Sequence, residues 1–194
     1  MLGIFVRFLV KQEELIKMAL RKASAYSKKR GRPFTRISRN KSKSYIKSVP
    51  HSKIVKFRQG SAHDFQTGKH AFAARLFAEE RVQIRDNALE ACRMYLSKFL
   101  DENLPGQYYL ALKVYPHHIL RENKLSAGAG ADRISTGMSH SYGVIIGRAA
   151  MVSPGQEIIF ISCTTEKAAR LAREALIHLK AKLPCASRVV FEKL

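Results

Sequence analysis

The chain has 194 residues, enough for one folded domain with a substantial core, and a hydrophobic content of 46% argues against general disorder. Lysine and arginine total 35 against 15 acids, a formal net charge of +20 with an isoelectric point near 10.2. This balance indicates that the partner is a polyanion, nucleic acid first and an anionic membrane surface second. Residues 15–63 hold 15 of the basic residues and no acid, so the excess charge is local.

The three cysteines do not suggest a metal or disulfide site. Cys92, Cys163 and Cys185 are odd in number and widely spaced, with no CxxC pair. We therefore expect buried, reduced thiols in a cytosolic protein.

The first segment, residues 1–17, starts apolar but is interrupted by Arg7. It is too short for a membrane span and lacks the basic start and small-residue cleavage site of a signal peptide. Met18 opens the sequence MALR, typical of a protein start. We expect translation to begin at Met18, with residues 1–17 a dispensable extension or a misassigned start.

Residues 18–52 alternate lysine and arginine with serine, glycine and aromatic residues and show no helical period. Such a segment cannot bury enough apolar surface to fold alone, so we predict an extended RNA-binding arm that orders against phosphates. Tyr26, Phe34 or Tyr45 would stack on exposed bases. The alternative is a solvated tail that only aids solubility. The basic residues predicted to contact RNA are Arg21, Lys22, Lys28, Lys29, Arg30, Arg32, Arg36, Arg39, Lys41 and Lys43.

The folded domain is predicted over residues 53–194. Strands or half-buried extended segments are expected at Lys53–Phe57 and His70–Phe77, with the polar stretch Gly60–Gly68 between them. Asp86 can cap a helix over Asn87–Glu102, in which apolar residues recur on one face. The expected apolar stripe is Leu89, Cys92, Leu96, Phe99 and Leu100.

Two further strands follow this helix. Gln107–Tyr115 is aromatic and alternating, which predicts a strand that Pro116 breaks, and His118–Arg121 predicts a second short strand. His117 and His118 would point to opposite faces, so they are poor joint metal ligands and fit positioning or RNA contact slightly better.

A long polar loop, residues 125–143, comes next. Its glycines allow close backbone approach, and Arg133 with several hydroxyls can contact phosphate and sugar oxygens. No Gly-Lys-Ser/Thr or GxGxxG pattern is present, which argues against nucleotide binding. The alternative is a surface loop with no function.

Beyond the loop, strands are predicted at Val144–Val152 and Glu157–Cys163, joined by a turn. A helix capped by Thr164 or Thr165 should run to about Leu183, before a last strand at Ser187–Phe191. Strands and helices do not alternate strictly, so the fold class is predicted to be α+β: a mixed β-sheet with two packed helices. An extended basic arm and a glycine-rich loop complete this expectation.

Several of these segments together resemble the L-ten-e/L-sixteen family of large ribosomal subunit proteins in its archaeal and eukaryotic form, closest to archaeal members. The resemblance covers roughly residues 18–191. The segments that carry it are Arg21, Arg32–Phe34, Val114–His118, Arg121–Lys124, Gly128–Arg133, Thr136–Met138, Tyr142–Gly143 and Gly155–Gln156.

The resemblance implies a protein without enzymatic activity or cofactor that binds large-subunit ribosomal RNA in the cytoplasmic ribosome, beside neighbouring ribosomal proteins. The family's loop reaches toward the peptidyl-transferase region and the tRNA in the aminoacyl site. Ser139 and Val144–Ile146 depart from the family pattern, where more basic residues are usual. The implied RNA contacts are Arg121, Lys124 and Arg133, and the implied tRNA-site loop residues are Gly128, Gly130, Asp132, Arg133, Gly137 and Met138.

Two other classes stay open. An RNA-directed modifying enzyme could use Asp132 with His118 or His140 as acid and base, although no cofactor, metal or nucleophile motif completes the set. An architectural DNA-binding protein would suit the charge, but no helix-turn-helix or zinc-finger pattern appears. A peripheral membrane role is weaker, because the basic residues lie on no amphipathic helix.

Overall fold

The structure is a computed structural model that describes residues 22–27, 33–123 and 141–194. Within these residues the strands form two sheets, and the strands in each sheet pair antiparallel. The five-stranded sheet has the order β1-β4-β7-β2-β8 and the three-stranded sheet the order β3-β6-β5. The strands are β1 (Arg58–Gly60), β2 (Phe72–Ala78), β3 (Val82–Arg85), β4 (Tyr108–Leu112), β5 (His118–Glu122), β6 (Val144–Val152), β7 (Glu157–Cys163) and β8 (Ser187–Lys193).

The predicted α+β class is confirmed, with two antiparallel sheets in place of the one mixed sheet that we expected. The turn between β6 and β7 forms as predicted: Gln156 N donates to Ser153 O at 3.1 Å, and Gly155 takes a φ of 78°. This turn does not make a hairpin. Its two strands enter different sheets, a choice that turn chemistry does not encode.

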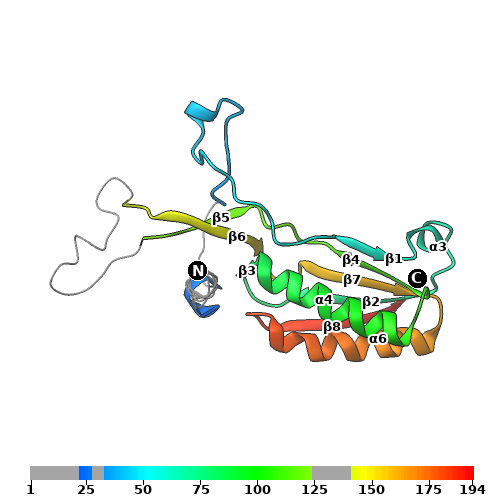
Figure 1. The fold of residues 1–194 in the computed structure, drawn as a ribbon. Helices are drawn as coiled ribbons and strands as arrows, with labels where there is room; N and C mark the ends of the chain where they lie inside the picture. The colour runs from blue at the N-terminus through cyan, green and yellow to red at the C-terminus, as the bar shows by residue number, and fades with distance from the viewer. Residues whose placement is uncertain (1–21, 28–32, 124–140) are drawn as a thin grey trace, which may run out of the picture.

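Two long helices, α4 (Asp86–Asn103) and α6 (Glu166–Leu179), lie together on one side of the five-stranded sheet (Figure 1). Thr165 caps α6 as predicted, its Oγ1 accepting from Ala168 N at 3.3 Å. The helix ends at Leu179 and continues as a 3-10 turn, Lys180–Lys182, to the buried Leu183.

Asp86 is the first residue of α4 and not its cap, which corrects our prediction. Its Oδ1 accepts from Asn87 N at 2.9 Å and its Oδ2 from Lys53 N at 3.1 Å. The carboxylate therefore satisfies helix-end donors from within the first turn and also ties the incoming chain to the helix.

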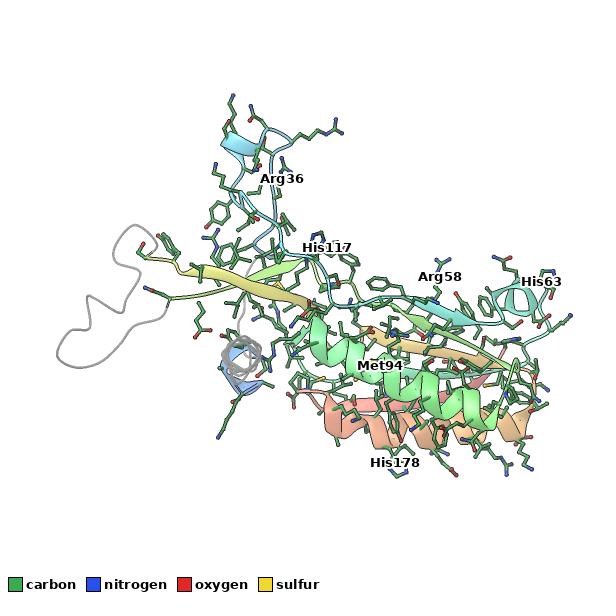
Figure 2. The ribbon with its side chains drawn as sticks, viewed as in Figure 1. Arg36, Arg58, His63, Met94, His117 and His178 are labelled. Atoms are coloured by element: carbon green, nitrogen blue, oxygen red, sulfur yellow. The ribbon has the colours of Figure 1, made fainter. Side chains whose placement is uncertain are left out.

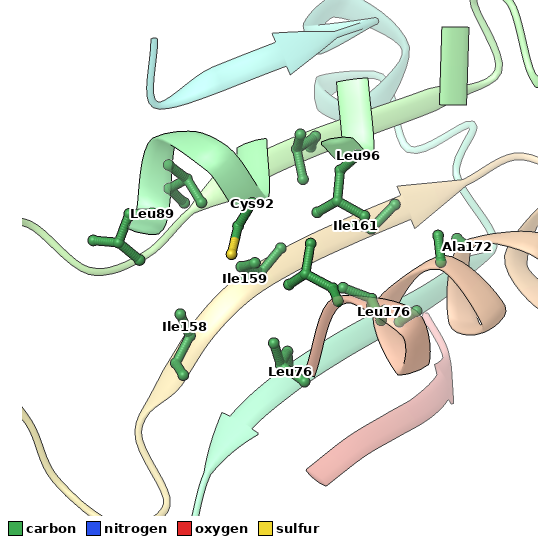
Figure 3. Packing of buried hydrophobic residues seen from close by; sticks show 14 of the residues in the cluster. Leu76, Leu89, Cys92, Leu96, Ile158, Ile159, Ile161, Ala172 and Leu176 are labelled. Atoms are coloured by element: carbon green, nitrogen blue, oxygen red, sulfur yellow. The ribbon is translucent and has the colours of Figure 1, made fainter. Parts of the chain in front are cut away.

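The main core lies between these helices and the sheet. Figure 2 places Met94 of α4 and His178 of α6 on the outer side, whereas Figure 3 shows Leu96, Leu176 and Ile161 packed toward one another. The predicted stripe on α4 is confirmed, with Phe99 partly buried at its edge and the others fully buried: Leu89, Cys92, Leu96 and Leu100.

The cysteines belong to this interior, as predicted. All three are free thiols, Cys92 and Cys163 buried and Cys185 half-buried. Burial raises the pKa of Cys92 and Cys163 to about 12, so both stay as unreactive thiols near neutral pH.

The segment Lys53–Phe57 is not a strand. It takes the other form that we predicted, a half-buried segment, with Ile54 buried and Phe57 partly buried. Two of its backbone N–H groups are used by α4: Lys53 N donates to Asp86, and Val55 N donates to Glu90 Oε2 at 3.3 Å. The hydrogen bonds to β4 begin at the end of the segment, where Leu112 N donates to Phe57 O at 2.8 Å, and strand β1 itself starts at Arg58. Other short elements also lie where none was predicted, among them β3, α2 (Ser24–Ser27) and α3 (Ala62–Gln66).

Candidate nucleic-acid interface

The second half of the predicted arm is fastened to the folded domain at β5. Phe34 N donates to His118 Nδ1 at 2.8 Å, and Ile119 N donates to Phe34 O at 2.9 Å. His118 is 4% exposed. One histidine of the predicted pair therefore has a positioning role: its unprotonated Nδ1 fixes the path of the arm.

Aromatic rings reinforce this attachment. Phe34 stacks on His118 with centroids 5.4 Å apart and on Tyr45 at 5.5 Å, and Arg121 Cζ lies 5.6 Å from the Tyr45 ring centroid. Phe34 and Tyr45, which we predicted to stack on RNA bases, thus already stack on each other within the protein. Both side chains nevertheless remain exposed to solvent. The sequence could not show that the arm meets β5.

Tyr26 is not available to a base, which corrects a further prediction. It is 7% exposed, and its hydroxyl donates to Glu122 Oε2 at 2.8 Å. Gln83 Nε2 donates to Tyr26 O at 3.1 Å. This tyrosine instead joins α2 to the three-stranded sheet.

The arm's tip, residues 36–44, is a compact turn built around Arg36. The Arg36 guanidinium donates to Ser38 O at 3.1 Å and to Arg39 O at 2.8 Å, and its Nε lies 3.2 Å from Ser44 Oγ. Asn40 caps a 3-10 turn at Lys41–Lys43. Arg36, predicted as an RNA contact, therefore holds the tip together.

Three other predicted cations are displayed on this tip. Arg39, Lys41 and Lys43 are exposed, and within the described residues their side chains have no hydrogen-bond or ion-pair partner. Figure 2 shows the tip standing away from the sheets and helices. The fold thus presents three cations whose charge no acid of the described part offsets by direct contact.

Arg121 lies at the foot of the arm, where its Nη2 is 3.4 Å from Tyr45 O. Its buried Nε has no hydrogen-bond partner in the described part of the chain. Lys22 is exposed beside α2. The other predicted RNA contacts and the predicted tRNA-site residues lie outside the described residues: Arg21, Lys28, Lys29, Arg30, Arg32, Lys124, Gly128, Gly130, Asp132, Arg133, Gly137 and Met138.

Strands β5 and β6 form a ribbon that extends away from the five-stranded sheet (Figure 1). Residues 124–140 connect its ends, where Glu122 pairs with Val144 and Asn123 Nδ2 donates to Ser141 O at 3.0 Å. Gly143 has a φ of 86°, and a Cβ there would lie 2.2 Å from Glu122 C. The loop's two stems are therefore closely joined.

Within the described residues, the side chains of the enzyme hypothesis do not form a catalytic site. No group of three or more His, Cys, Asp and Glu residues there could hold a metal ion. His118 Nδ1 is used by Phe34, and the other residues of the enzyme hypothesis, Asp132 and His140, lie outside that part. No described helix is long and apolar enough to cross a membrane.

A polar cavity of about 700 Å³ beside β1 offers no free acid–base pair either. Lys69 and Ser61 hydrogen-bond to Asp64 and hold its pKa at about 2. Asp101 Oδ1 accepts from Tyr108 OH at 2.5 Å. Both carboxylates in this lining serve structural contacts.

Comparison with known proteins decides the family. The family described as "Ribosomal protein L16p/L10e" matches residues 32–190. The chain belongs to this family. It is 43% identical over 178 residues to the large ribosomal subunit protein uL16 of Staphylothermus marinus, an alignment that covers 91% of this chain and 96% of that protein.

Other archaeal relatives agree. Identity is 42% to the uL16 of Pyrobaculum calidifontis, over 90% of this chain and 95% of that protein. It is 41% to the uL16 of Methanococcus maripaludis, over 91% and 96%. The predicted family resemblance, in its archaeal form, is confirmed, and the matched region contains the arm's tip, the ribbon and the loop.

Sequence reasoning missed the residues that fix the interface. His118 and Arg121 were singled out, but their use in holding Phe34 and Tyr45 was not predicted. Arg148, which donates to Pro50 O at 2.6 Å, was not singled out at all. A lone arginine in a β-rich segment was the only signal, and it does not reveal a partner 98 residues away.

Proposed function

We propose that this L16p/L10e family member is a structural constituent of the large ribosomal subunit, binds its ribosomal RNA and catalyses no reaction. We further propose that it helps form the aminoacyl-tRNA site near the peptidyl-transferase region. The observation that carries the RNA-binding part is the tip of the arm, where Arg39, Lys41 and Lys43 are exposed without protein partners.

The geometry supports phosphate binding in two ways. The Phe34 and His118 contacts hold the arm before RNA arrives, so less conformational entropy is lost on binding. The absence of acids from residues 15–63 leaves the surrounding potential positive. Each phosphate neutralised by the arm would release counterions, which makes the affinity depend on salt.

The tRNA contribution is assigned to the loop over residues 125–143. Gly128, Gly130 and Gly137 would let the backbone approach RNA closely, Arg133 would supply a cation, and Asp132 and Met138 would complete the loop's surface. Support comes from family membership and from the closely joined stems at Glu122 and Val144.

An Arg133→Ala substitution should leave the stability of the isolated protein unchanged, because Arg133 belongs to a polar, glycine-rich segment. Large subunits reconstituted with this variant should bind aminoacyl-tRNA at the aminoacyl site more weakly, by roughly 5- to 20-fold for one lost charged contact. Filter binding measures this affinity. Arg173→Ala, which removes an exposed arginine of α6, is the matched control, and equal binding by both variants would contradict the assignment.

Competition between nucleic acids tests the RNA-binding proposal itself. Labelled large-subunit ribosomal RNA from the source cells should be displaced by the same unlabelled RNA far better than by duplex DNA at matched salt and phosphate concentration. Equal displacement would favour the architectural DNA-binding alternative. Turnover of the RNA, or modification of one of its bases, would favour the enzyme.

A further inference from the structure

A series of three neighbouring rings lies beside the arm and reaches the surface. Phe57 stacks on Tyr115 with centroids 5.3 Å apart and planes at 25°, and Tyr115 meets His117 at 4.6 Å and 50°. Phe57 is half-buried, Tyr115 is 44% exposed and His117 is exposed. The series therefore runs from the edge of the core to solvent.

Hydrogen bonds to Tyr115 hold these rings in place. Arg148 donates from Nη1 to Tyr115 OH at 3.2 Å while its Nε donates to Pro50 O, and His117 N donates to Tyr115 O at 3.0 Å. Val114 is buried between the exposed side chains around it. The surface is pre-organised, which lowers the entropy cost of placing a ligand on it.

The outermost ring is available. In contrast to Phe34, which has rings at both 5.4 and 5.5 Å, His117 has Tyr115 as its one ring partner within the described residues. The ring nitrogens of His117 make no hydrogen bond with that part of the chain. A flat ligand can thus continue the series beyond His117.

The surroundings favour a polyanion that carries such flat groups. Lys53, Lys56 and Arg58 are exposed on the adjoining segment, which contains no acid. Figure 2 shows His117 and Arg58 on the same side of the molecule as Arg36, opposite His178. Cations beside exposed aromatic rings are the pattern that binds unpaired nucleotides.

We propose that His117, backed by Tyr115 and Phe57, stacks one unpaired base of the large-subunit ribosomal RNA, with Lys53 and Lys56 on the flanking phosphates. This inference rests on the proposed function and adds a site within it. Paired bases are stacked inside their helix, so the site would read an unpaired or looped-out nucleotide. It places a defined RNA contact on the folded domain, separate from the arm's tip and from residues 125–143.

The test is the affinity of the full chain for large-subunit ribosomal RNA from the source cells, measured for every variant in the same buffer. His117→Ala should weaken binding about 5-fold or more, as expected for one lost base–aromatic stack. His117→Phe should restore the affinity, because it keeps a ring. His178→Ala, an exposed histidine on the opposite side, should have no effect.

Salt dependence separates stacking from charge. The His117→Ala variant should keep the wild-type slope of log affinity against log salt, whereas Lys53→Gln and Lys56→Gln should each flatten it. Circular dichroism should show an unchanged fold for each variant, since these side chains are exposed.

The outcomes separate this site from the proposed function. Unchanged affinity of His117→Ala, with a loss on neutralising the arm's tip, would overturn the stacking site and leave the proposed function standing. A loss that His117→Phe does not restore would mean hydrogen bonding and would also overturn stacking. Failure of the wild-type chain to prefer ribosomal RNA over duplex DNA would overturn both.

Discussion

Neutralising the arm's tip should weaken binding to large-subunit ribosomal RNA by about 10- to 100-fold near 0.1 M salt and make the affinity less dependent on salt. The variant replaces Arg39, Lys41 and Lys43 with glutamine. Each lost phosphate contact should reduce the slope of log affinity against log salt by about 0.7 to 0.9, so three should reduce it by roughly 2 to 3. Fluorescence anisotropy over a salt series measures both quantities.

The fold should survive these changes, because the three side chains have no protein partner within the described residues. The matched control replaces Lys167, Arg173 and Lys193, which are exposed on α6 and β8, and removes the same net charge. If both triple variants lost affinity equally, total charge and not the arm would govern binding. Deleting the arm would be a less clean test, since Ile46 is fully buried.

Replacing Gly143 with alanine should lower the free energy of local opening at the end of the β5–β6 ribbon by roughly 2 to 4 kcal/mol. Two costs combine. A φ of 86° strains any residue with a Cβ, and that atom would lie 2.2 Å from Glu122 C and 2.4 Å from Asn123 N. Hydrogen exchange at the amides of Glu122 and Val144 measures the opening directly.

Gly155→Ala isolates the contact cost. Gly155 has a similar φ of 78°, but nothing lies within 4 Å of the Cβ position. This control should lose only the backbone share, about 1 kcal/mol, at its own turn. Equal losses in the two variants would show that contact with the β5 stem does not constrain the loop.

The sequence was informative wherever local patterns matched the final environment. Strands Val144–Val152 and Glu157–Cys163 were predicted with the bounds that the structure has, and Thr165 caps its helix as expected. In these segments the β-rich composition of the strands and the capping residue of the helix favour the same elements that tertiary packing requires.

Sequence patterns failed where long-range contacts decide. The segment Lys53–Phe57 looks like a strand, but its N–H groups are taken by carboxylates of a helix more than thirty residues away. The sequence of the arm predicts that it cannot fold alone. Part of the arm packs nevertheless, because Phe34 hydrogen-bonds to His118 and Ile119 of β5. Local periodicity carries no record of such partners.

The candidate interface, too, could be predicted from the sequence only in part. Charge alone identified the arm, and the spacing of glycines with Arg133 identified the loop, whose residues 124–140 lie outside the described part. Which cations face solvent could not be read from the sequence: Arg36 and Lys41 look equivalent there, yet one builds the tip and the other is displayed on it.

The most direct test of the account is quantitative mass spectrometry of large ribosomal subunits purified from the source cells after a high-salt wash. We expect one copy of this protein per subunit. Its absence from washed subunits, with the protein recovered free or on other RNAs, would contradict the account and reopen the enzyme and DNA-binding alternatives.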